Sequence, residues 1–358
     1  MTDQKNESTR RTSSPSAVHA AHATTSARPS RRDALILGAG VAAGWTGLVG
    51  AANAQTSKDA PKEVRLDYAY YSPTSLVLRR FGWLEEDLAK DGIGVRWVLS
   101  AGSNRALEYL NAGSIDIGST AGLAALLARA NGNPIRAPYI FSRPEWTALV
   151  VRGDSGIRSL ADLKGKKVAA TKGTDPYLFL LRALHTAGLK RADIEHVGLQ
   201  HADGRAALEQ GRVDAWAGLD PLMAASELDA GSRLLYRNVG FNTYGFLNVR
   251  EDFLARHPRE VQRVILAYER ARQWTIAHPS DAAKILSEEA KVSLPVALLQ
   301  VKLRTDFSQP RPSDEHVKAL QAAAPILTAE QLVRPGVDLN RAIAELVDTR
   351  FAAGLVKA

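Results

Sequence analysis

The sequence predicts an α/β fold made of two similar lobes, and three observations support this prediction. From Pro61 onward, short apolar runs alternate with helical patterns, which is typical of βα units in a parallel sheet. A strand–loop–helix–Gly turn–strand unit occurs twice, over 99–118 and again over 199–216. The length of 358 residues also suits about two domains of roughly 150 residues each.

Hydrophobic periodicity places the individual elements. Between Ser75 and Lys90, apolar residues recur at helical spacing, which predicts one helix there. The other predicted helices are 104–111, 122–130, 177–187 and 205–210, and 251–358 is predicted to be almost wholly helical. The predicted strands are 64–71, 94–99, 114–118, 136–141, 147–152, 167–171, 194–199, 212–218 and 245–249.

Composition excludes several classes of protein. The chain is 45% hydrophobic and 23% charged, an ordinary globular composition. Its net charge of +8 is spread along the chain, whereas a nucleic-acid-binding protein concentrates basic residues in a patch. It has no cysteine, which rules out disulfides, thiolate metal sites, iron–sulfur clusters and a cysteine nucleophile.

The first 54 residues have the pattern of a secretory signal. Arg31 and Arg32 precede an uncharged, glycine-containing stretch from Ala34 to Ala54, which ends in a small-x-small cleavage pattern. The paired arginines resemble a twin-arginine signal. The alternative is an uncleaved membrane anchor, which the glycines and the cleavage pattern disfavour. We therefore predict export to a Gram-negative periplasm, with no stable membrane anchor after cleavage.

Four loops rich in small polar residues follow predicted strands, and each precedes a predicted helix. Free N–H groups at a helix start, together with hydroxyls, form an anion site without a cationic side chain. Simple helix capping is the alternative for any single loop. All four together, in an exported two-lobed protein, favour ligand binding in a central cleft. The loops are 71–75, 101–104, 118–121 and 172–175.

The chain resembles a known family over about 64–253, with weaker similarity to the end. This is the group of periplasmic substrate-binding proteins that bind aliphatic sulfonates, taurine or nitrate for ABC importers. The resemblance is carried by the segments 111–118, 159–168, 172–174, 182–189 and 213–221, the last of which contains Asp-Ala-Trp and Asp-Pro. It departs from the family at Leu219, where an aromatic residue often precedes Asp-Pro.

The resemblance implies a type II-like periplasmic binding protein fold, with a central cleft, two hinge crossovers and a helical C-terminal region. By that analogy, lobe 1 comprises 62–148 plus 245–358, and lobe 2 comprises 149–244. The loops and the resemblance together suggest candidate ligand-binding residues, which are Ser72, Thr74, Ser75, Gly102, Ser103, Ser119, Thr120, Gly173, Thr174, Trp216, Asp220 and Tyr244.

Several of these residues have a second interpretation. Trp216 is either a core residue or a surface for an alkyl chain, and Asp220 either caps a helix or accepts a bond from a ligand amine. Lys172 is either surface charge or a source of positive potential in the cleft. Tyr70, Trp146, Trp216 and Tyr244 together suggest a ligand with an apolar body. Asp116 and Asp214 are interpreted as structural turn residues.

The sequence offers little for catalysis. It contains no nucleophile elbow, no His-Glu-x-x-His and no P-loop. His196 and His201 are close in sequence, but surface positions are the better interpretation than a metal pair. Glu145, beside Arg143, is interpreted as part of a hinge ion pair.

The sequence therefore predicts a monomeric binding protein and no enzyme, without a cofactor or a metal. Its ligand is predicted to be an aliphatic or aryl sulfonate, or a taurine-like organosulfur anion, which it delivers to an ABC permease and its ATPase. The alternatives are a protein that binds nitrate, another small anion or a pyrimidine precursor, and a sensor or a non-cysteine enzyme on the same fold.

Overall fold

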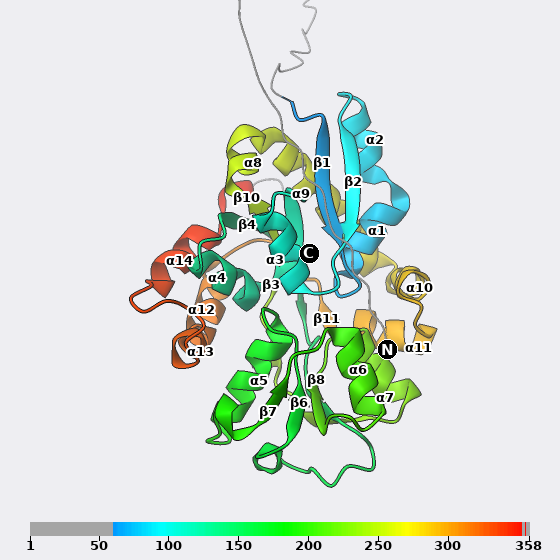
Figure 1. Cartoon of the computed structure of the whole chain (residues 1–358). Coiled ribbons are helices and arrows are strands. Elements are labelled where there is room, and N and C mark those ends of the chain that lie inside the picture. The colour runs from blue at the N-terminus through cyan, green and yellow to red at the C-terminus, as the bar shows by residue number, and fades with distance from the viewer. Residues whose placement is uncertain (1–59, 353–354, 356–358) are drawn as a thin grey trace, which may run out of the picture. The chain divides into compact units, whose positions relative to one another are not determined.

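The computed structural model describes residues 60–352 and residue 355, and these form two mixed β-sheets with helices packed around them. The predicted signal segment, residues 1–54, lies outside the described residues. The first sheet has six strands in the order β11-β4-β10-β3-β1-β2 (Figure 1). They are β1 (Glu63–Tyr68), β2 (Gly94–Leu99), β3 (Ile117–Ala121), β4 (Ile135–Pro144), β10 (Gly245–Arg250) and β11 (Thr305–Asp306).

The second sheet has five short strands in the order β7-β6-β8-β5-β9. All of them come from the middle of the chain, between the two groups of first-sheet strands. They are β5 (Leu149–Val151), β6 (Lys167–Ala169), β7 (Glu195–Val197), β8 (Ala215–Ala217) and β9 (Arg233–Tyr236). The sequence analysis did not predict β9 or β11.

The α/β class is confirmed, and the sheets, for which the alternation of elements indicated parallel strands, are mixed. Strands β1, β2 and β3 are parallel, as are β6, β7 and β8. Strand β10 pairs antiparallel with both β3 and β4, and β5 pairs antiparallel with β8 and β9. The reason is that β5 and β10 enter their sheets directly from the other sheet, so no βα unit sets their direction.

Helices cover both sheets. Around the first sheet lie α1 (Pro73–Phe81), α2 (Trp83–Ala89), α3 (Ser103–Asn111) and α4 (Gly122–Ala130), and around the second lie α5 (Asp175–Thr186), α6 (His201–Glu209) and α7 (Leu222–Asp229). The single helix predicted over 75–90 is two helices. They break at Gly82, whose positive φ of 65° ends α1 in the left-handed conformation that glycine adopts at low cost.

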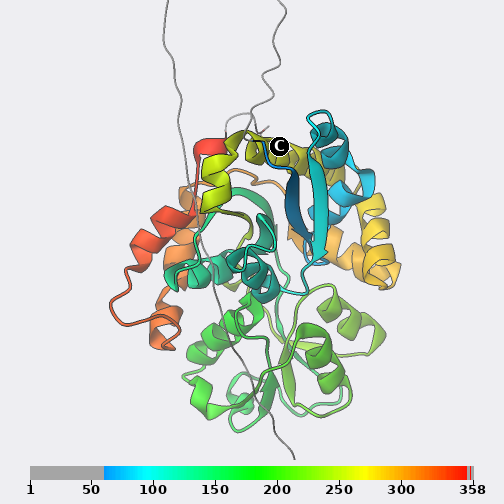
Figure 2. The ribbon, with the colours of Figure 1, turned by 45° about the horizontal axis from the view of Figure 1, so that its top comes forward.

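The predicted helical C-terminal region is confirmed over the described residues, apart from β11. Helices α12 and α14 pack beside α4 (Figures 1 and 2). The helices of this region are α8 (Glu251–Arg256), α9 (Pro258–Ala277), α10 (Pro279–Ala290), α11 (Leu294–Leu298), the π-helix η4 (Leu299–Leu303), α12 (Asp314–Ala323), α13 (Pro325–Ala329) and α14 (Leu339–Leu346). Four 3₁₀ turns complete the list, at Ala161–Leu163, Arg191–Asp193, Val239–Phe241 and Arg350–Ala352.

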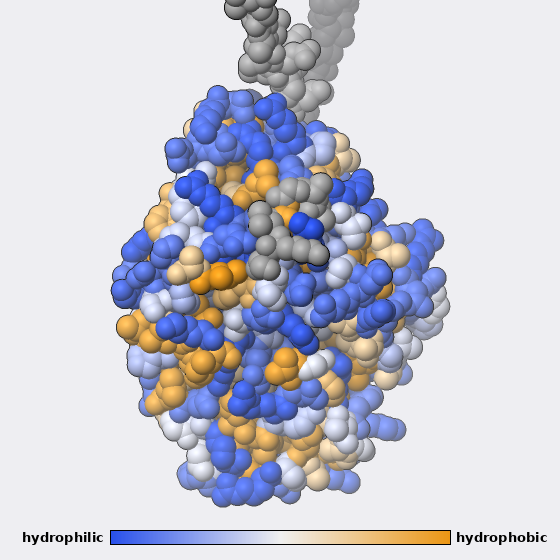
Figure 3. All heavy atoms as spheres, turned by 180° about the vertical axis from the view of Figure 1, so that it is seen from behind, coloured by the Kyte–Doolittle hydropathy of each residue, from blue (hydrophilic) through white to orange (hydrophobic). Residues whose placement is uncertain are grey.

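None of the helices in the described part of the chain is both long and apolar enough to cross a bilayer. The face turned away from the view of Figure 1 mixes hydrophilic and apolar side chains (Figure 3).

Two crossover segments connect the sheets, one between β4 and β5 and the other between β9 and β10. They are bonded to each other, because Thr147 N donates to Asn242 Oδ1 at 2.9 Å and Asn242 Nδ2 donates to Thr147 O at 3.3 Å. Two crossovers joining two sheets are what the sequence analysis expected. The predicted lobe boundaries at 148/149 and 244/245 stay a prediction.

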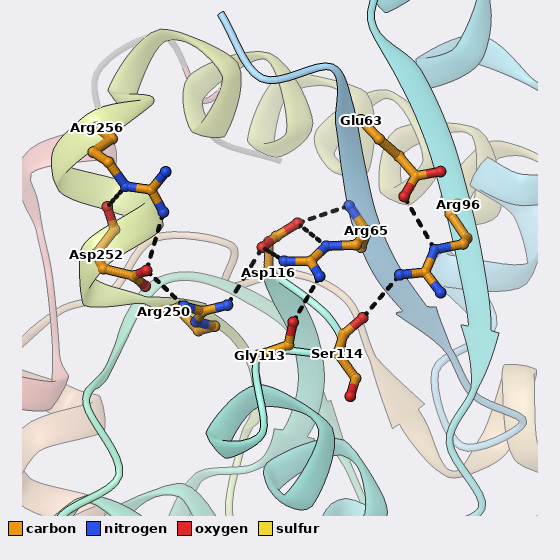
Figure 4. Close-up of polar contacts among 9 residues, drawn as sticks. All are labelled: Glu63, Arg65, Arg96, Gly113, Ser114, Asp116, Arg250, Asp252 and Arg256. Atoms are coloured by element: carbon orange, nitrogen blue, oxygen red, sulfur yellow. Dashed lines mark hydrogen bonds and ion pairs between the residues drawn. The ribbon is translucent and has the colours of Figure 1, made fainter. Parts of the chain in front are cut away.

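A buried ion-pair cluster ties β1 to β3 at the amino ends of the strands (Figure 4). Asp116 precedes β3 and is only 2% exposed. Its carboxylate accepts from Arg65 Nη2 at 2.5 Å, from Arg65 Nε at 2.9 Å and from Arg65 N at 3.0 Å, while Arg250 Nη1 lies 3.7 Å away. The interpretation of Asp116 as a structural residue is therefore confirmed.

We expect Asp116→Asn to lower the free energy of unfolding by about 3 kcal/mol, because it removes the charge that two arginines neutralise. Urea unfolding at neutral pH measures the change. Asp252→Asn is the matched control, since Asp252 pairs with the same Arg250 on the exposed side of the cluster and should cost under about 1 kcal/mol. Equal losses in the two variants would contradict this account of the cluster.

Candidate functional site

The candidate site lies where the first-sheet and second-sheet parts of the chain touch, and we call this place the joint. It comprises 102–104 at the start of α3, and 171–173 and 200–201 ahead of α5 and α6. A Cβ atom on Gly102 would lie 2.9 Å from His201 Nε2, and one on Gly173 would lie 3.4 Å from the Cβ of Asn104. At Gly102 the two parts therefore meet with room for little more than a hydrogen atom, whereas at Gly173 a Cβ would come into ordinary van der Waals contact.

Buried polar atoms without a hydrogen-bond partner gather around the joint and at the neighbouring strand ends. A buried polar atom left unpaired costs roughly 1–3 kcal/mol, so proteins seldom keep several together unless a ligand or solvent satisfies them. From the first-sheet side come Asp67 Oδ2, Ser72 Oγ, Thr74 Oγ1, Ser100 Oγ, Asn104 Oδ1 and Ser119 Oγ. The crossover contributes Thr147 Oγ1, and the second-sheet side contributes Gln200 Oε1 and His201 Nε2.

Three helices begin at these loops, namely α1, α3 and α5. Their N-cap residues are Ser72, Gly102 and Thr174, and none of the three makes a side-chain capping bond. Thr174 Oγ1 instead donates to Thr171 O at 2.6 Å. Simple capping, the alternative considered from the sequence, does not explain Ser72 or Thr174 in this structure. The N-terminal N–H groups of the three helices favour negative charge nearby.

A pocket of about 440 Å³ opens beside the joint, between α3, α4 and the 172–173 loop. Lys172, Gly173 and Asn104 lie on its wall. Lys172 is exposed, which fits a source of positive potential at the rim better than a buried contact.

Other predicted site residues have their polar atoms engaged within the first-sheet part. Ser75 Oγ donates to Ser72 O at 2.7 Å, and Ser103 Oγ accepts from Ala121 N at 3.0 Å. Thr120 Oγ1 accepts from Asn248 Nδ2 at 2.7 Å. The segment 118–121 is the end of β3 rather than a loop, because it pairs with β10 along its whole length.

Trp216 and Tyr244 lie in packed surroundings. Trp216 is 1% exposed in β8, where it packs with Val150, Leu208 and Met223, so the structure places it in the core of the second sheet. Tyr244 donates to Glu315 at 2.5 Å, and its ring lies 4.3 Å from that of His316 on α12. Burial and the bond to Glu315 raise the pKa of Tyr244 to about 12.

The carboxylate of Asp220 already accepts hydrogen bonds from two groups of the protein, and this concerns the prediction that it accepts a bond from a ligand amine. Its Oδ1 accepts from Ala224 N at 2.9 Å, as the capping interpretation predicts, and from Arg304 Nη1 at 3.1 Å. Both side chains of this ion pair are less than 5% exposed. Burial raises the pKa of Asp220, and the charge of Arg304 opposes that shift.

The structure shows the surroundings of His196 and His201, the possible metal pair, and of Glu145, the expected member of a hinge ion pair. His196 Nε2 lies 3.1 Å from Ala170 O and His201 Nδ1 lies 3.3 Å from Thr171 Oγ1. No group of His, Asp and Glu suited to a metal occurs among residues 60–352. His201 is buried rather than on the surface, and burial lowers its pKa to about 3, so the ring is neutral.

Glu145 forms an ion pair near the crossover, with Arg237 at 2.8 Å.

Sequence reasoning missed Asp67 and Asp175. Asp67 is fully buried in β1, but charged and apolar residues alternate along that strand, so the sequence alone did not distinguish Asp67 from Glu63 and Arg65. Its Oδ1 accepts from Ser119 N at 2.7 Å. Asp175, at the start of α5, accepts from Trp146 Nε1 at 3.0 Å, from Thr243 N at 3.0 Å and from Thr243 Oγ1 at 2.9 Å. It thereby bonds both crossovers to α5.

Two α/β parts joined by crossovers, with unpaired polar atoms and uncapped helix starts at their joint, define a solute-binding protein. The model of the family described as NMT1/THI5 like matches residues 87–282, more than half of the chain. The chain is 31% identical over 293 residues to a protein of Escherichia coli strain K12 named as an aliphatic sulfonates-binding protein. That match covers 81% of this chain and 91% of the relative. The chain belongs to the NMT1/THI5-like family of substrate-binding proteins.

Solved structures agree in fold. The alkanesulfonate-binding protein SsuA from Xanthomonas axonopodis pv. citri, bound to MOPS, has a TM-score of 0.72 and 28% identity, over 80% of this chain and 98% of that chain. The periplasmic aliphatic sulphonate binding protein SsuA from Escherichia coli has a TM-score of 0.68 and 30% identity, over 79% and 92%. The desulfurization enzyme DSZB, at 19% identity and a TM-score of 0.59, shares the fold alone. The predicted binding-protein fold is confirmed.

We expect Asp67→Asn to stabilise the ligand-free protein at pH 8 by roughly 2–4 kcal/mol and to give little gain at pH 4. Burial raises the pKa of Asp67 to about 7, above the value of ~3.9 in an unfolded chain. The folded protein therefore keeps this proton up to a higher pH than the unfolded chain does. Its free energy of unfolding consequently falls as pH rises from about 4 to about 7.

Urea unfolding of wild type and Asp67→Asn at pH 4 and pH 8 measures this difference. Asp203→Asn, at an exposed position on α6, is the control and should change stability by under about 1 kcal/mol at either pH. If Asp67→Asn gave the same change at both pH values, the carboxyl would not titrate as described.

Proposed function

We propose that this protein is a periplasmic component of an ABC import system that binds a sulfonate-class organic anion between its two lobes. The names of the relatives support this proposal, since they bind aliphatic sulfonates or, in one structure, the sulfonate buffer MOPS. The lobes are those predicted from the sequence, 62–148 plus 245–358 and 149–244. Residues 1–54 would direct export as a signal, and an ABC permease with its ATPase would receive the ligand.

The observation that carries the proposal is the set of uncapped helix starts at Ser72, Gly102 and Thr174, with unpaired buried hydroxyls next to them. A sulfonate offers three acceptor oxygens and one negative charge. Backbone N–H groups and hydroxyls satisfy those oxygens, and three helix N-termini favour the charge. No buried arginine or lysine is needed at such a site.

Closure of the lobes follows from the contacts at the joint. A ligand that touches Ser72 or Ser119 on one side and Thr174 or His201 on the other bonds to both sides only when the lobes are closed. It therefore shifts the population toward the closed form by its differential affinity. The closed form is then the one presented to the permease.

A ligand screen by thermal shift tests this function. The purified protein is heated with alkyl and aryl sulfonates, taurine, nitrate, sulfate, carboxylates and pyrimidines. A ligand at 100 times its Kd adds about 2.7 kcal/mol of stability, which gives a clear rise in Tm. Shifts confined to the sulfonate and taurine series support the proposal, whereas shifts with pyrimidines or nitrate alone would replace it.

We expect Gly102→Ala to weaken binding of the best sulfonate at least tenfold while leaving the fold intact. The added Cβ would lie 2.9 Å from His201 Nε2, so it hinders closure, and the extended backbone at Gly102 accepts alanine without strain. Isothermal titration calorimetry measures Kd. Gly94→Ala is the control, because its Cβ meets nothing closer than 3.6 Å at the start of β2. Unchanged affinity in Gly102→Ala would show that the joint does not close on the ligand.

A further inference from the structure

The pocket beside the joint has walls from both parts of the chain. Helices α3 and α4 lie side by side and form the first-sheet wall, and the loop of Lys172 and Gly173 ahead of α5 forms the second-sheet wall (Figure 1). Next to the pocket, a Cβ on Gly173 would lie 3.4 Å from the Cβ of Asn104, so the two walls are in contact. A group in this pocket therefore touches both parts only while the parts are together.

The lining of this pocket combines an apolar floor with carboxamide side chains. In the floor, Leu107 and Ala124 are buried, and Leu127 and Ala128 are half-buried. A carboxamide offers an acceptor oxygen and N–H donors, the same kinds of group that a peptide bond presents. Several carboxamides around an apolar floor are therefore suited to a peptide backbone that carries an apolar side chain. The carboxamides of the lining belong to Asn104, Asn111, Asn131 and Asn133.

Two of these carboxamides have an acceptor oxygen without a partner. Asn133 is only 8% exposed, and its Nδ2 donates to Leu107 O at 3.1 Å, which fixes the orientation of the side chain. Its Oδ1 has no hydrogen-bond partner within the described residues, and neither has the buried Oδ1 of Asn104. Because an acceptor that is buried unpaired is unfavourable, both oxygens favour a bound group with N–H donors.

The charges of the lining favour an acidic partner. Lys172 is exposed and forms no ion pair among the described residues. Glu108, the other charged residue of the lining, is already paired with Arg105 at 2.7 Å. The ammonium group of Lys172 at the rim therefore attracts a negative charge that the described part of the chain does not supply.

We propose that this pocket binds an extended, acidic peptide segment of the ABC permease, and that the segment recognises the arrangement in which the two parts touch. Its backbone N–H groups donate to Asn104 and Asn133, an apolar side chain packs on the floor, and a carboxylate lies near Lys172. This inference deepens the proposed function and rests on it. The bound sulfonate and the segment favour the same arrangement, so each strengthens the binding of the other.

Ala128→Phe tests the pocket, because the added ring fills the space above the apolar floor. We expect uptake of a radiolabelled sulfonate to fall at least about tenfold, since the peptide segment no longer fits. Uptake is measured in cells of the source organism whose own copy of the gene is deleted, at a saturating concentration of the sulfonate that gives the largest thermal shift. The Kd of the purified variant for that sulfonate should stay within about twofold of wild type, because the substitution lies outside the helix starts and the joint.

Ala255→Phe is the matched control. Ala255 lies on α8, at the end of the first-sheet part that faces away from the second sheet (Figure 1). It lines a different pocket, of about 580 Å³, together with Arg136 and Phe351. The same ring is therefore added at a place that the second-sheet part does not reach, and uptake should stay within about twofold of wild type.

A pair of substitutions at Asn111 tests the acidic character of the segment without filling the pocket. Asn111 is the exposed last residue of α3. Asn111→Asp should lower uptake by at least roughly threefold, because it repels a carboxylate, whereas Asn111→Lys should leave uptake unchanged or raise it. Equal effects of the two substitutions would overturn the acidic segment. This pair also decides the matter if Ala128→Phe does not fold.

Photo-crosslinking identifies the partner. Asn111, on the pocket wall, is replaced by the photo-reactive benzoylphenylalanine, and intact cells are irradiated with and without the sulfonate. Mass spectrometry should identify a product in which this chain is joined to a permease subunit, and its yield should rise with the sulfonate. A product that joins two copies of this chain, or no product with a membrane protein, overturns the proposal.

The outcomes separate this inference from the function beneath it. If Ala128→Phe raises the Kd and its uptake recovers at higher sulfonate concentration, the pocket acts through the sulfonate site, and the inference is overturned while the proposed function stands. Unchanged uptake in Ala128→Phe has the same consequence. If wild type binds no sulfonate, the inference and the proposed function are both overturned.

Discussion

The carboxylate of Asp175 is the contact on which the arrangement of the two sheets depends. It stands in the first turn of α5, on the second-sheet side, and accepts from Trp146 in one crossover and twice from Thr243 in the other. Burial raises its pKa, and these three donors oppose that shift. Because Gly173 and Thr174 immediately precede Asp175, the same contact sets where the second-sheet side of the joint lies against Gly102 and Asn104.

A second connection runs outside the crossovers. Arg304, which follows the π-helix η4, pairs with Asp220 and also with Glu227 on α7. Helix α11 packs against α7 through Val296, Ala224 and Ala225. The C-terminal region therefore contacts the second-sheet part as well as the first, so any motion between the parts has to carry this contact along or break it.

Much of the fold was predictable because its signals are local. Helix α4 and strand β2 were predicted with the observed bounds, and for α4 the reason is that its apolar run ends at the stop residues of 131–134. Strand direction was not predictable in the same way. It depends on which sheet a strand joins after a crossover. The residues of β5 and β10 do not by themselves indicate that they pair antiparallel with their neighbours.

The site was predictable in outline and not in detail. Small polar loops before helices indicated the helix starts, and Ser72, Gly102 and Thr174 are there. Partners distant in sequence decided the rest. Asp220 meets an arginine 84 residues away, and Trp216 faces α6 across Gly204, where a Cβ would lie 2.7 Å from the indole nitrogen. Asp67 could be recognised as unusual only once its neighbours were known to be uncharged.

Trp146 is an intrinsic fluorescent probe of the crossovers. Its indole is 2% exposed, stands edge-on to Tyr71 at 5.8 Å on the first-sheet side, and donates to Asp175 on the second-sheet side. Indole emission responds to polarity and to hydrogen bonding at the ring nitrogen, so a rearrangement at the crossovers changes the light this residue emits. The chain therefore needs no attached dye for a rearrangement around Trp146 to be followed in real time by stopped-flow fluorescence.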